Sequence, residues 1–340
     1  MDTEKQTIDE EGAANSPSTN VVQFSKTRQQ KFNRLYEEYQ AIEKENAWDA
    51  GEVGYINSVM VQATLPYREP KGNPAVWGRT SGEWSLVIQP GMYLESQKQT
   101  LPSGKTKVTN VAKSIGYPFG SKPRLLLAWL GREIKHQKSP EIKLGRSLSA
   151  FLHELGLDDA SGGPNGSITQ TKEQMLRLFS SRIAMVKTPT IDAVNWEVNG
   201  MQIADRQQLW WDPSKPAQAG LFESTVVLSQ KFYDEFSNGV PIDMRALRAL
   251  KASPFELDLY CWLTYRFFTL HKRTVVPWEA LQVQFGTETV CSRKFKWKLR
   301  DALKSVLSVY PDAKVDPTQD AGLVLLPSKT SVSRLIAMSR

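Results

Sequence analysis

The same order of helical and strand patterns occurs twice along this chain of 340 residues, and this repeat limits the possible folds more than any other feature. Each copy predicts a helix, a short strand, a second helix, a turn, a long third helix and a β-hairpin. This order is typical of the winged helix, a helix-turn-helix variant whose long helix enters the major groove of DNA. The repeat therefore predicts an α+β protein with two tandem winged-helix domains.

The first copy is predicted between residues 122 and 210. Its helices are expected at 122–137, 147–155 and 169–187, its short strand at 141–144, and its hairpin at 193–198 and 201–210. Asn199 and Gly200 lie between the two hairpin strands, and the dipeptide Asn-Gly favours a two-residue hairpin turn.

A capping pattern marks the start of the second copy. Ser253 is predicted to cap a helix, Pro254 to occupy its first position and Glu256 to complete a capping box. The helices are expected at 254–270, 277–285 and 292–310, the short strand at 273–276, and the closing hairpin at 313–316 and 322–326. A strand at 224–228 and a helix at 230–237 precede this copy.

Composition divides the chain into five parts. We expect a disordered acidic tail at 1–20, an amphipathic helix at 24–46, a first winged-helix domain with an N-terminal β-rich extension at 51–211, a linker at 212–220, and a second winged-helix domain at 221–330. The amphipathic helix either pairs with a second chain or packs on its own domain.

The distribution of charge favours a polyanionic partner. The net charge of +7 comes from 43 basic and 36 acidic residues. The first twenty residues hold five acidic residues and one lysine, so the remaining chain carries a surplus of about 11 positive charges. Nucleic acid is the commonest polyanion for such a protein, although a surplus of this kind also serves solubility.

No sequence feature predicts export or membrane insertion. No run approaches the roughly 20 apolar residues that cross a bilayer, and the N-terminal segment lacks the apolar region of a signal peptide. The two cysteines, Cys261 and Cys291, form no CxxC pair, which argues against a disulfide framework and a zinc site. We therefore expect a cytoplasmic protein.

The helix expected at 169–187 has one apolar arc and one polar arc at 100° per residue. The apolar arc holds Met175, Leu176, Phe179, Ile183 and Val186, and the polar arc holds Gln170, Gln174, Arg177 and Ser181. Because glutamine pairs well with adenine and arginine with guanine, the polar arc is a candidate for reading bases. An ordinary solvated face is the alternative.

The helix expected at 292–310 is more strongly charged. Its apolar stripe consists of Phe295, Leu299, Ala302, Leu303, Val306 and Tyr310. One arc beside Trp297 holds Arg293, Lys296, Arg300 and Lys304. Asp301 is the single acidic residue between Ser292 and Lys304, whereas a solvated helix normally intersperses acids for pairing four residues apart. Such one-sign charge indicates an anionic partner, and we expect DNA.

No catalytic or cofactor site is predicted. Gly104-Lys105-Thr106 resembles the end of a phosphate-binding loop, but Gln99 stands where that motif needs glycine. Asp158-Asp159 fits a turn better than a metal site. Three histidines are scattered singly: His136, His153 and His271. We expect no enzyme activity, no metal and no cofactor.

Five strings of the sequence carry a family resemblance: MVQATLPYREPKGNPAVWGR (60–79), YPFGSKPRLLLAWL (117–130), GGPNGSITQTKEQMLRLFSS (162–181), PIDMRALRALKASPFELDLYCWLTYR (241–266) and RKFKWKLRDAL (293–303). They resemble the RepA-type plasmid replication initiators, a group described as plasmid-encoded RepA proteins. The resemblance covers about residues 59–328.

The resemblance implies a protein that binds directly repeated origin sequences in double-stranded DNA, opens an adjacent AT-rich stretch and helps to load the host replicative helicase, alongside the host initiator. By analogy with initiators that have two winged helices, a homodimer is one expected state. The resemblance also transfers DNA contact to Gln170, Gln174, Arg177, Arg293, Lys296, Arg300 and Lys304. A dedicated transcriptional repressor remains an alternative, and a primase or nicking enzyme is a weaker one.

Overall fold

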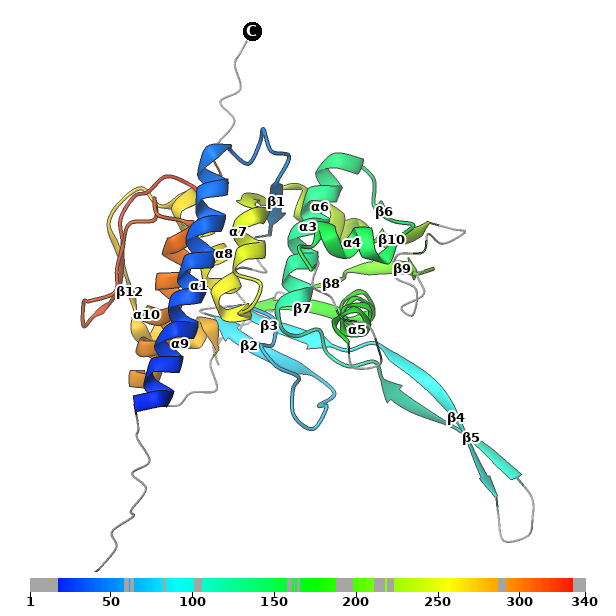
Figure 1. Ribbon diagram of the computed structural model, residues 1–340. Helices are drawn as coiled ribbons and strands as arrows, with labels where there is room; N and C mark the ends of the chain where they lie inside the picture. The colour runs from blue at the N-terminus through cyan, green and yellow to red at the C-terminus, as the bar shows by residue number, and fades with distance from the viewer. Residues whose placement is uncertain are drawn as a thin grey trace, which may run out of the picture.

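Helices and small antiparallel sheets alternate along the chain, as expected for the α+β class (Figure 1). The computed structural model describes residues 18–57, 61, 64–81, 84–100, 106–157, 161, 163, 166–187, 198–210, 218, 223–286 and 292–332. Within this part of the chain, no helix is long and apolar enough to cross a membrane.

The helices are α1 (Ser18–Lys44), α3 (Ser121–Gln137), α4 (Leu148–Glu154), α5 (Ser167–Ser180), α6 (Gln230–Ser237), α7 (Met244–Ala249), α8 (Pro254–Thr269), α9 (Trp278–Phe285) and α10 (Ser292–Val309). The strands are β1 (Val53–Ile56), β2 (Trp77–Ser81), β3 (Trp84–Gln89), β4 (Met92–Thr100), β5 (Thr106–Ser114), β6 (Glu141–Gly145), β7 (Arg182–Lys187), β8 (Val198–Gln202), β9 (Ala204–Gln208), β10 (Ser224–Leu228), β11 (Val240–Asp243), β12 (Thr274–Pro277), β13 (Val315–Asp316) and β14 (Gly322–Leu325). The expected β-rich extension corresponds to β1 to β5.

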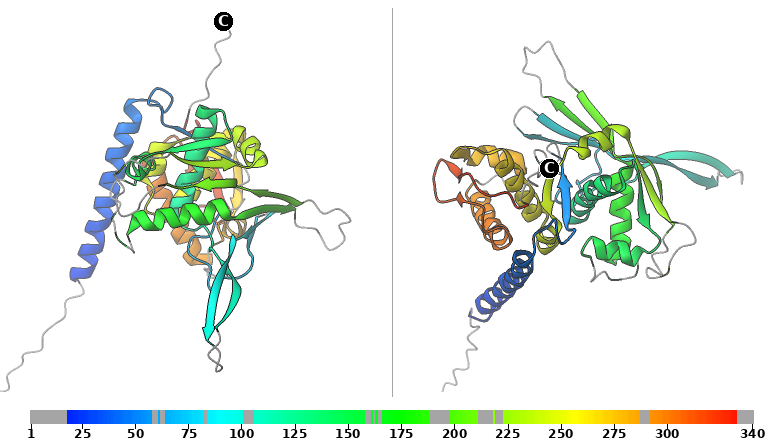
Figure 2. Two further views of the ribbon diagram at one scale, coloured as in Figure 1. Left: turned by 90° about the vertical axis from the view of Figure 1, so that its right-hand side faces the viewer. Right: turned by 90° about the horizontal axis from the view of Figure 1, so that it is seen from above.

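One hydrophobic core runs through both halves of the molecule. The apolar block of α3, residues 125–130, is buried, and α3 packs against β1, which pairs with β11. Beyond β11, helix α8 continues the same core, and α10 packs on α8. Seen from above, β1 lies between the helices of the first half and those of the second (Figure 2).

Each element predicted for the second copy, from α8 to β14, begins and ends within about two residues of its bounds in the structure. The Ser253 hydroxyl accepts the Glu256 N–H at 3.3 Å, so the predicted cap is present. The Glu256 side chain, however, accepts a hydrogen bond from Lys31 of α1 at 2.6 Å. The residue expected to complete a capping box thus ties α1 to α8.

Two three-stranded sheets share one strand order. In the second half the order is β12-β14-β13, and in the first half it is β6-β10-β9. The strands that correspond to the closing hairpin of the first copy are therefore β9 and β10. The strands β7 and β8 instead extend β2 and β3 into a separate four-stranded sheet.

This pairing changes two sequence-based assignments. The sequence predicts that the strand at 224–228 belongs to the second domain, but β10 pairs with β6 and β9 of the first half. The linker expected at 212–220 lies outside the described residues except for Gln218, and it connects two strands that pair with each other. Part of the expected first hairpin, residues 193–197, also lies outside them.

The helix expected at 169–187 ends at Ser180, and the remaining residues form β7. Within β7, Ile183 and Met185 are buried while Arg182 is exposed, which is the two-residue period of a strand. Because Ile183 follows Phe179 by four residues, the same apolar residues also fit a helix. Pairing of β7 with β3 and β8 decides the outcome.

Helix α1 packs on α10 and α7 of its own chain, with Leu35 fully buried. This contact supports the second of the two roles that we considered for an amphipathic helix at 24–46. The helix includes residues 18–20 of the expected acidic tail, whose other residues, 1–17, lie outside the described part.

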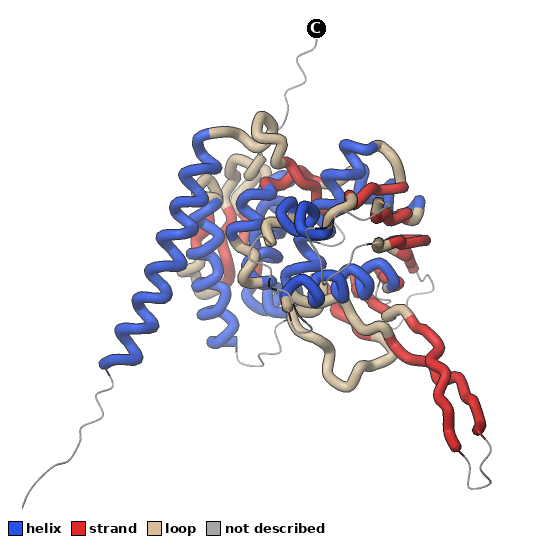
Figure 3. Tube along the Cα trace, turned by 45° about the vertical axis from the view of Figure 1, so that its right-hand side comes forward, coloured by secondary structure: helices blue, strands red, loops and turns tan. Residues whose placement is uncertain are grey.

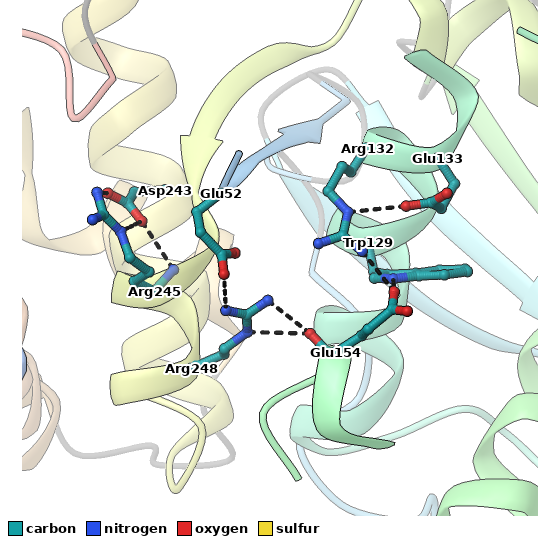
Figure 4. A network of polar contacts seen from close by, with 8 residues as sticks. All are labelled: Glu52, Trp129, Arg132, Glu133, Glu154, Asp243, Arg245 and Arg248. Atoms are coloured by element: carbon teal, nitrogen blue, oxygen red, sulfur yellow. Dashed lines mark hydrogen bonds and ion pairs between the residues drawn. The ribbon is translucent and has the colours of Figure 1, made fainter. Parts of the chain in front are cut away.

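Polar contacts also join the two halves (Figure 4). Arg248 of α7 donates to Glu52 at 2.8 Å and, from two nitrogens, to the Glu154 carbonyl at 2.8 and 3.2 Å. The Glu154 carboxylate accepts hydrogen bonds from Trp129 and Arg132 of α3. These contacts link the end of α4 to α3 and α7.

The most enclosed of these links is an ion pair between α3 and α8. Arg124 donates to both carboxylate oxygens of Asp258, at 2.7 and 2.8 Å, and both side chains are buried. The remaining Arg124 donors bind three carbonyl oxygens, those of Leu65, Pro66 and Gly120. The guanidinium is therefore bonded on all sides.

We expect Asp258→Ala to lower the free energy of unfolding by about 3–5 kcal/mol, because Arg124 would keep a buried charge without its partner. The double variant Arg124→Met/Asp258→Leu should recover part of this loss. Glu69→Ala breaks an ion pair with Arg177 in which the glutamate is exposed, and it should cost less than about 1 kcal/mol. Urea unfolding measures all three, and equal effects of Asp258→Ala and Glu69→Ala would contradict the argument.

Candidate nucleic-acid interface

Helix α10 has the amphipathic form that its sequence predicts. Its apolar stripe is buried against α8, α9 and α1, and the buried residues include all those expected: Phe295, Leu299, Ala302, Leu303, Val306 and Tyr310, which follows the helix. Burial of this stripe fixes which side of the helix faces solvent. The basic arc is therefore held on the outer surface.

The four basic residues expected on this arc have two kinds of surroundings. Arg293 and Lys304 are exposed, whereas Lys296 and Arg300 are half-buried. The charged groups of Lys296 and Arg300 lie 5.5 and 5.4 Å from the centre of the Trp278 ring. Such cation–π contacts hold the side chains in place without neutralising their charge.

The loop between β13 and β14 borders the same arc. Arg300 donates to the Pro317 carbonyl at 2.9 Å, and Trp297 is 66% exposed between the basic residues. A shallow depression on this face is lined by Ser292, Arg293, Lys296, Trp297 and Arg300. A second depression continues past Lys304 to Pro317 and Thr318. We call this surface, defined by Arg293, Lys296, Trp297, Arg300 and Lys304, the α10 basic face.

Lys298 points to the other side of α10. Its ammonium lies 4.3 Å from the centre of the Phe255 ring and 5.4 Å from that of Tyr67. Burial lowers the pKa of Lys298, and the nearby guanidinium groups of Arg68 and Arg79 lower it further. Lys298 is therefore a half-buried residue on the side of α10 that faces Phe255 of α8, and it does not belong to the α10 basic face.

The polar arc expected on α5 is largely covered. Gln174 is 6% exposed and accepts the Phe119 N–H at 2.8 Å, and Ser181 is fully buried and donates to the Arg177 carbonyl. Gln170 remains exposed and accepts a hydrogen bond from Lys122. Gln174 and Ser181 therefore cannot reach base edges in this structure.

Arg177 is engaged as well. Its Nη1 lies 2.7 Å from a carboxylate oxygen of Glu69, and its guanidinium lies over the Phe119 ring. The segment at 116–119 and residue Glu69 together cover the face of α5 that the helical projection left open. The sequence of α5 alone could not predict that this face is covered, because the covering residues precede α3 in the sequence.

The residues described here contain no group of three His, Cys, Asp or Glu side chains that could hold a metal ion. The partial phosphate-loop motif, Asp158-Asp159 and Cys291 lie outside them, apart from Thr106 at the start of β5 and Gln99 within β4. The three histidines lie on α3, on α4 and after α8.

The fold and this interface define an α+β protein that exposes one strongly basic helix. Residues 117–280 match the family model described as "Plasmid encoded RepA protein". The predicted resemblance is thus confirmed for the part of the chain that runs from the segment before α3 into α9. Helix α10 lies beyond the matched residues, so its assignment rests on its own geometry.

Other comparisons give weaker similarity. No curated protein sequence matches this chain. A crystal structure of selenomethionine derivatives of domains 2 and 3 of RctB is similar with a TM-score of 0.47 and 11% sequence identity, covering 80% of this chain and 97% of that one. A second structure of RctB domains 2–3 has a TM-score of 0.44 and 10% identity, covering 78% and 94% of the two chains.

The covered arc of α5 leads to a specific expectation. Gln174→Ala should lower the free energy of unfolding by about 1–3 kcal/mol, because it leaves the Phe119 N–H without its acceptor in a partly buried place. Gln170→Ala changes an exposed residue and should have an effect within about 0.5 kcal/mol. Thermal unfolding, followed by DNA binding well below both transitions, separates the roles. A normal stability with reduced DNA affinity for Gln174→Ala would restore the base-reading interpretation.

Proposed function

We propose that the protein initiates plasmid replication by binding repeated origin sequences in double-stranded DNA, promoting origin opening and loading of the replicative helicase. The match of residues 117–280 to the plasmid-encoded RepA family carries this proposal. The α10 basic face adds the surface through which DNA would be bound. We further propose that the protein works in the cytoplasm.

We assign both repeated units to the winged-helix arrangement as part of this proposal. In the second unit, α9 and α10 form the helix-turn-helix, β13 and β14 form the wing, and α10 enters the major groove. In the first unit, α4 and α5 take the helical positions and β9 and β10 the wing. The shared strand order of the two small sheets supports the assignment.

The charge of α10 supports contact with phosphates. Six of the thirteen residues from Ser292 to Lys304 are basic and one, Asp301, is acidic. Their mutual repulsion in the free protein is relieved when these side chains bind phosphates and release the counterions that are condensed on the DNA. The ordered positions of Lys296 and Arg300 over Trp278 also lower the entropy that is lost on binding.

We expect the logarithm of the binding constant for the plasmid's origin region to fall steeply with the logarithm of the salt concentration. The slope of this plot, the log–log salt slope, should be steeper than about −4. The double variant Arg293→Gln/Lys304→Gln removes two exposed charges from the α10 basic face and should reduce the slope by about 1.8. As a control, Lys44→Gln/Lys143→Gln removes two exposed charges from α1 and β6 and should leave it unchanged. Binding measured between about 50 and 200 mM salt tests this, and equal slopes for both double variants would contradict it.

Plasmid maintenance tests the proposed function itself. A plasmid that carries this gene and its flanking DNA as the sole origin should replicate in a host cell, and Arg293→Gln/Lys304→Gln should abolish replication while the protein still accumulates. A dedicated repressor is the alternative function. It would bind the same DNA and reduce transcription of the gene, yet the plasmid would be lost.

We propose that origin opening uses binding energy and not catalysis. Several copies bound in phase would bend the DNA, and melting of flexible AT-rich steps would relieve the strain. The purified protein on a supercoiled origin plasmid should therefore expose unpaired thymines to permanganate without ATP. A strand nick at one fixed position on addition of magnesium would instead support a nicking enzyme.

A further inference from the structure

The strands β4 and β5 form a two-stranded ribbon that leaves the body of the protein (Figure 3). Nine residues on each strand pair without a register shift, from Met92 opposite Ser114 to Thr100 opposite Thr106. At about 3.3 Å per residue, the ribbon is about 30 Å long. Most of its side chains are exposed along both strands.

The direction of the ribbon is fixed at its base. The Ile115 N–H donates to the Gly91 carbonyl at 2.8 Å, which closes the ribbon where it meets the body. A Cβ atom at Gly91 would lie 2.6 Å from the Cβ of Ser180, so the backbone here passes directly against the end of α5. The ribbon is thus anchored on α5 and projects from there.

The ribbon carries a net positive charge. Residues 92–114 contain four lysines and one acidic residue, Glu95. Glu95 forms an ion pair with Lys113 near the base, at 2.5 Å. Lys98 and Lys107 lie in the outer half, on opposite faces of the ribbon, since Lys98 is opposite Val108 and Lys107 is opposite Gln99. The outer half therefore presents positive charge in both directions.

The other polar side chains of the outer half are amides and hydroxyls, and they include Gln97, Gln99, Thr100, Thr106, Thr109 and Asn110. Amide groups of this kind form paired hydrogen bonds with adenine, and lysine binds guanine and phosphate. A two-stranded ribbon with strands about 4.8 Å apart also fits the major groove, which is about 12 Å wide and 8.5 Å deep.

We infer that the β4–β5 ribbon is a second DNA-binding element, which enters a groove of the same duplex at a distance from the α10 basic face. This inference rests on the proposed function, because it adds a contact to the same protein–DNA complex. In Figures 1 and 2 the ribbon and α10 lie at opposite ends of the molecule. With both contacts, the length of DNA that the protein covers would exceed the length that a single winged helix covers.

A different occupant would be a second copy of this chain. Met92 and Leu94 near the base and Val108 farther out share one face and are 57%, 68% and 57% exposed. Apolar groups on a ribbon can contact thymine methyl groups as well as protein. The excess of lysine, which would face lysine again in a symmetric pair of ribbons, favours DNA over a second copy.

The test compares Lys98→Gln/Lys107→Gln with the control Lys44→Gln/Lys143→Gln on a mixed-sequence duplex of about 40 base pairs, or four helical turns. Loss of two phosphate contacts should reduce the log–log salt slope by about 1.8, while the control retains the wild-type slope. Combined with Arg293→Gln/Lys304→Gln, the reduction should be about 3.6, because the two surfaces contact separate phosphates. Circular dichroism confirms that each variant is folded.

The outcomes separate the two hypotheses. If the α10 variant lowers the slope and the ribbon variant behaves like the control, the ribbon proposal is wrong and the proposed function stands. If the wild-type protein binds neither this duplex nor the origin region, the proposed function fails, and the ribbon proposal with it. Sedimentation of the variant Leu94→Ser/Val108→Ser tests whether the ribbon instead binds a second copy of this chain. A wild-type dimer that becomes monomeric in this variant, with an unchanged slope for the lysine variant, would overturn DNA binding by the ribbon.

Discussion

Arg124 and Asp258 join α3 to α8 through a buried ion pair, and the placement of the second half against the first depends on this contact. A displaced guanidinium or carboxylate would leave a charge buried without a partner, so the pair admits one relative placement of the two helices. Since α10 packs on α8, the ion pair also sets where the α10 basic face lies relative to the first half. Arg124 also donates hydrogen bonds to three backbone carbonyls that precede α3, so its position constrains those segments as well.

The two repeated units differ in what covers their long helix. The segment at 116–119 and Glu69 lie against α5, and they take up the hydrogen bonds of Gln174 and Arg177. No such segment lies over the described outer face of α10, where Arg293 and Lys304 are exposed. A repeated fold therefore has unequal surfaces, and the proposed division follows: α10 binds DNA while α5 anchors the β4–β5 ribbon.

Local sequence patterns predicted the second unit well. The cap at Ser253, the apolar stripe of α10 and the short strand before α9 depend on neighbouring residues, so their signals lie within a few turns of chain. The first closing hairpin was placed wrongly, because Asn199-Gly200 favours a turn but does not choose which strands pair. Strand partners such as β10 with β6 are about 80 residues apart, and no local pattern reports them.

The sequence by itself determined the α+β class, the order of elements in the second unit, the inward face of α10 and the resemblance to plasmid-encoded RepA proteins. These properties follow from the spacing of apolar and charged residues within single elements. The tertiary structure alone decided that Gln174 and Ser181 are buried, that residues 182–187 form a strand, and that β4 and β5 project from the body. Each of these outcomes depends on contacts between distant segments, whose free energy outweighs the preference of any one segment.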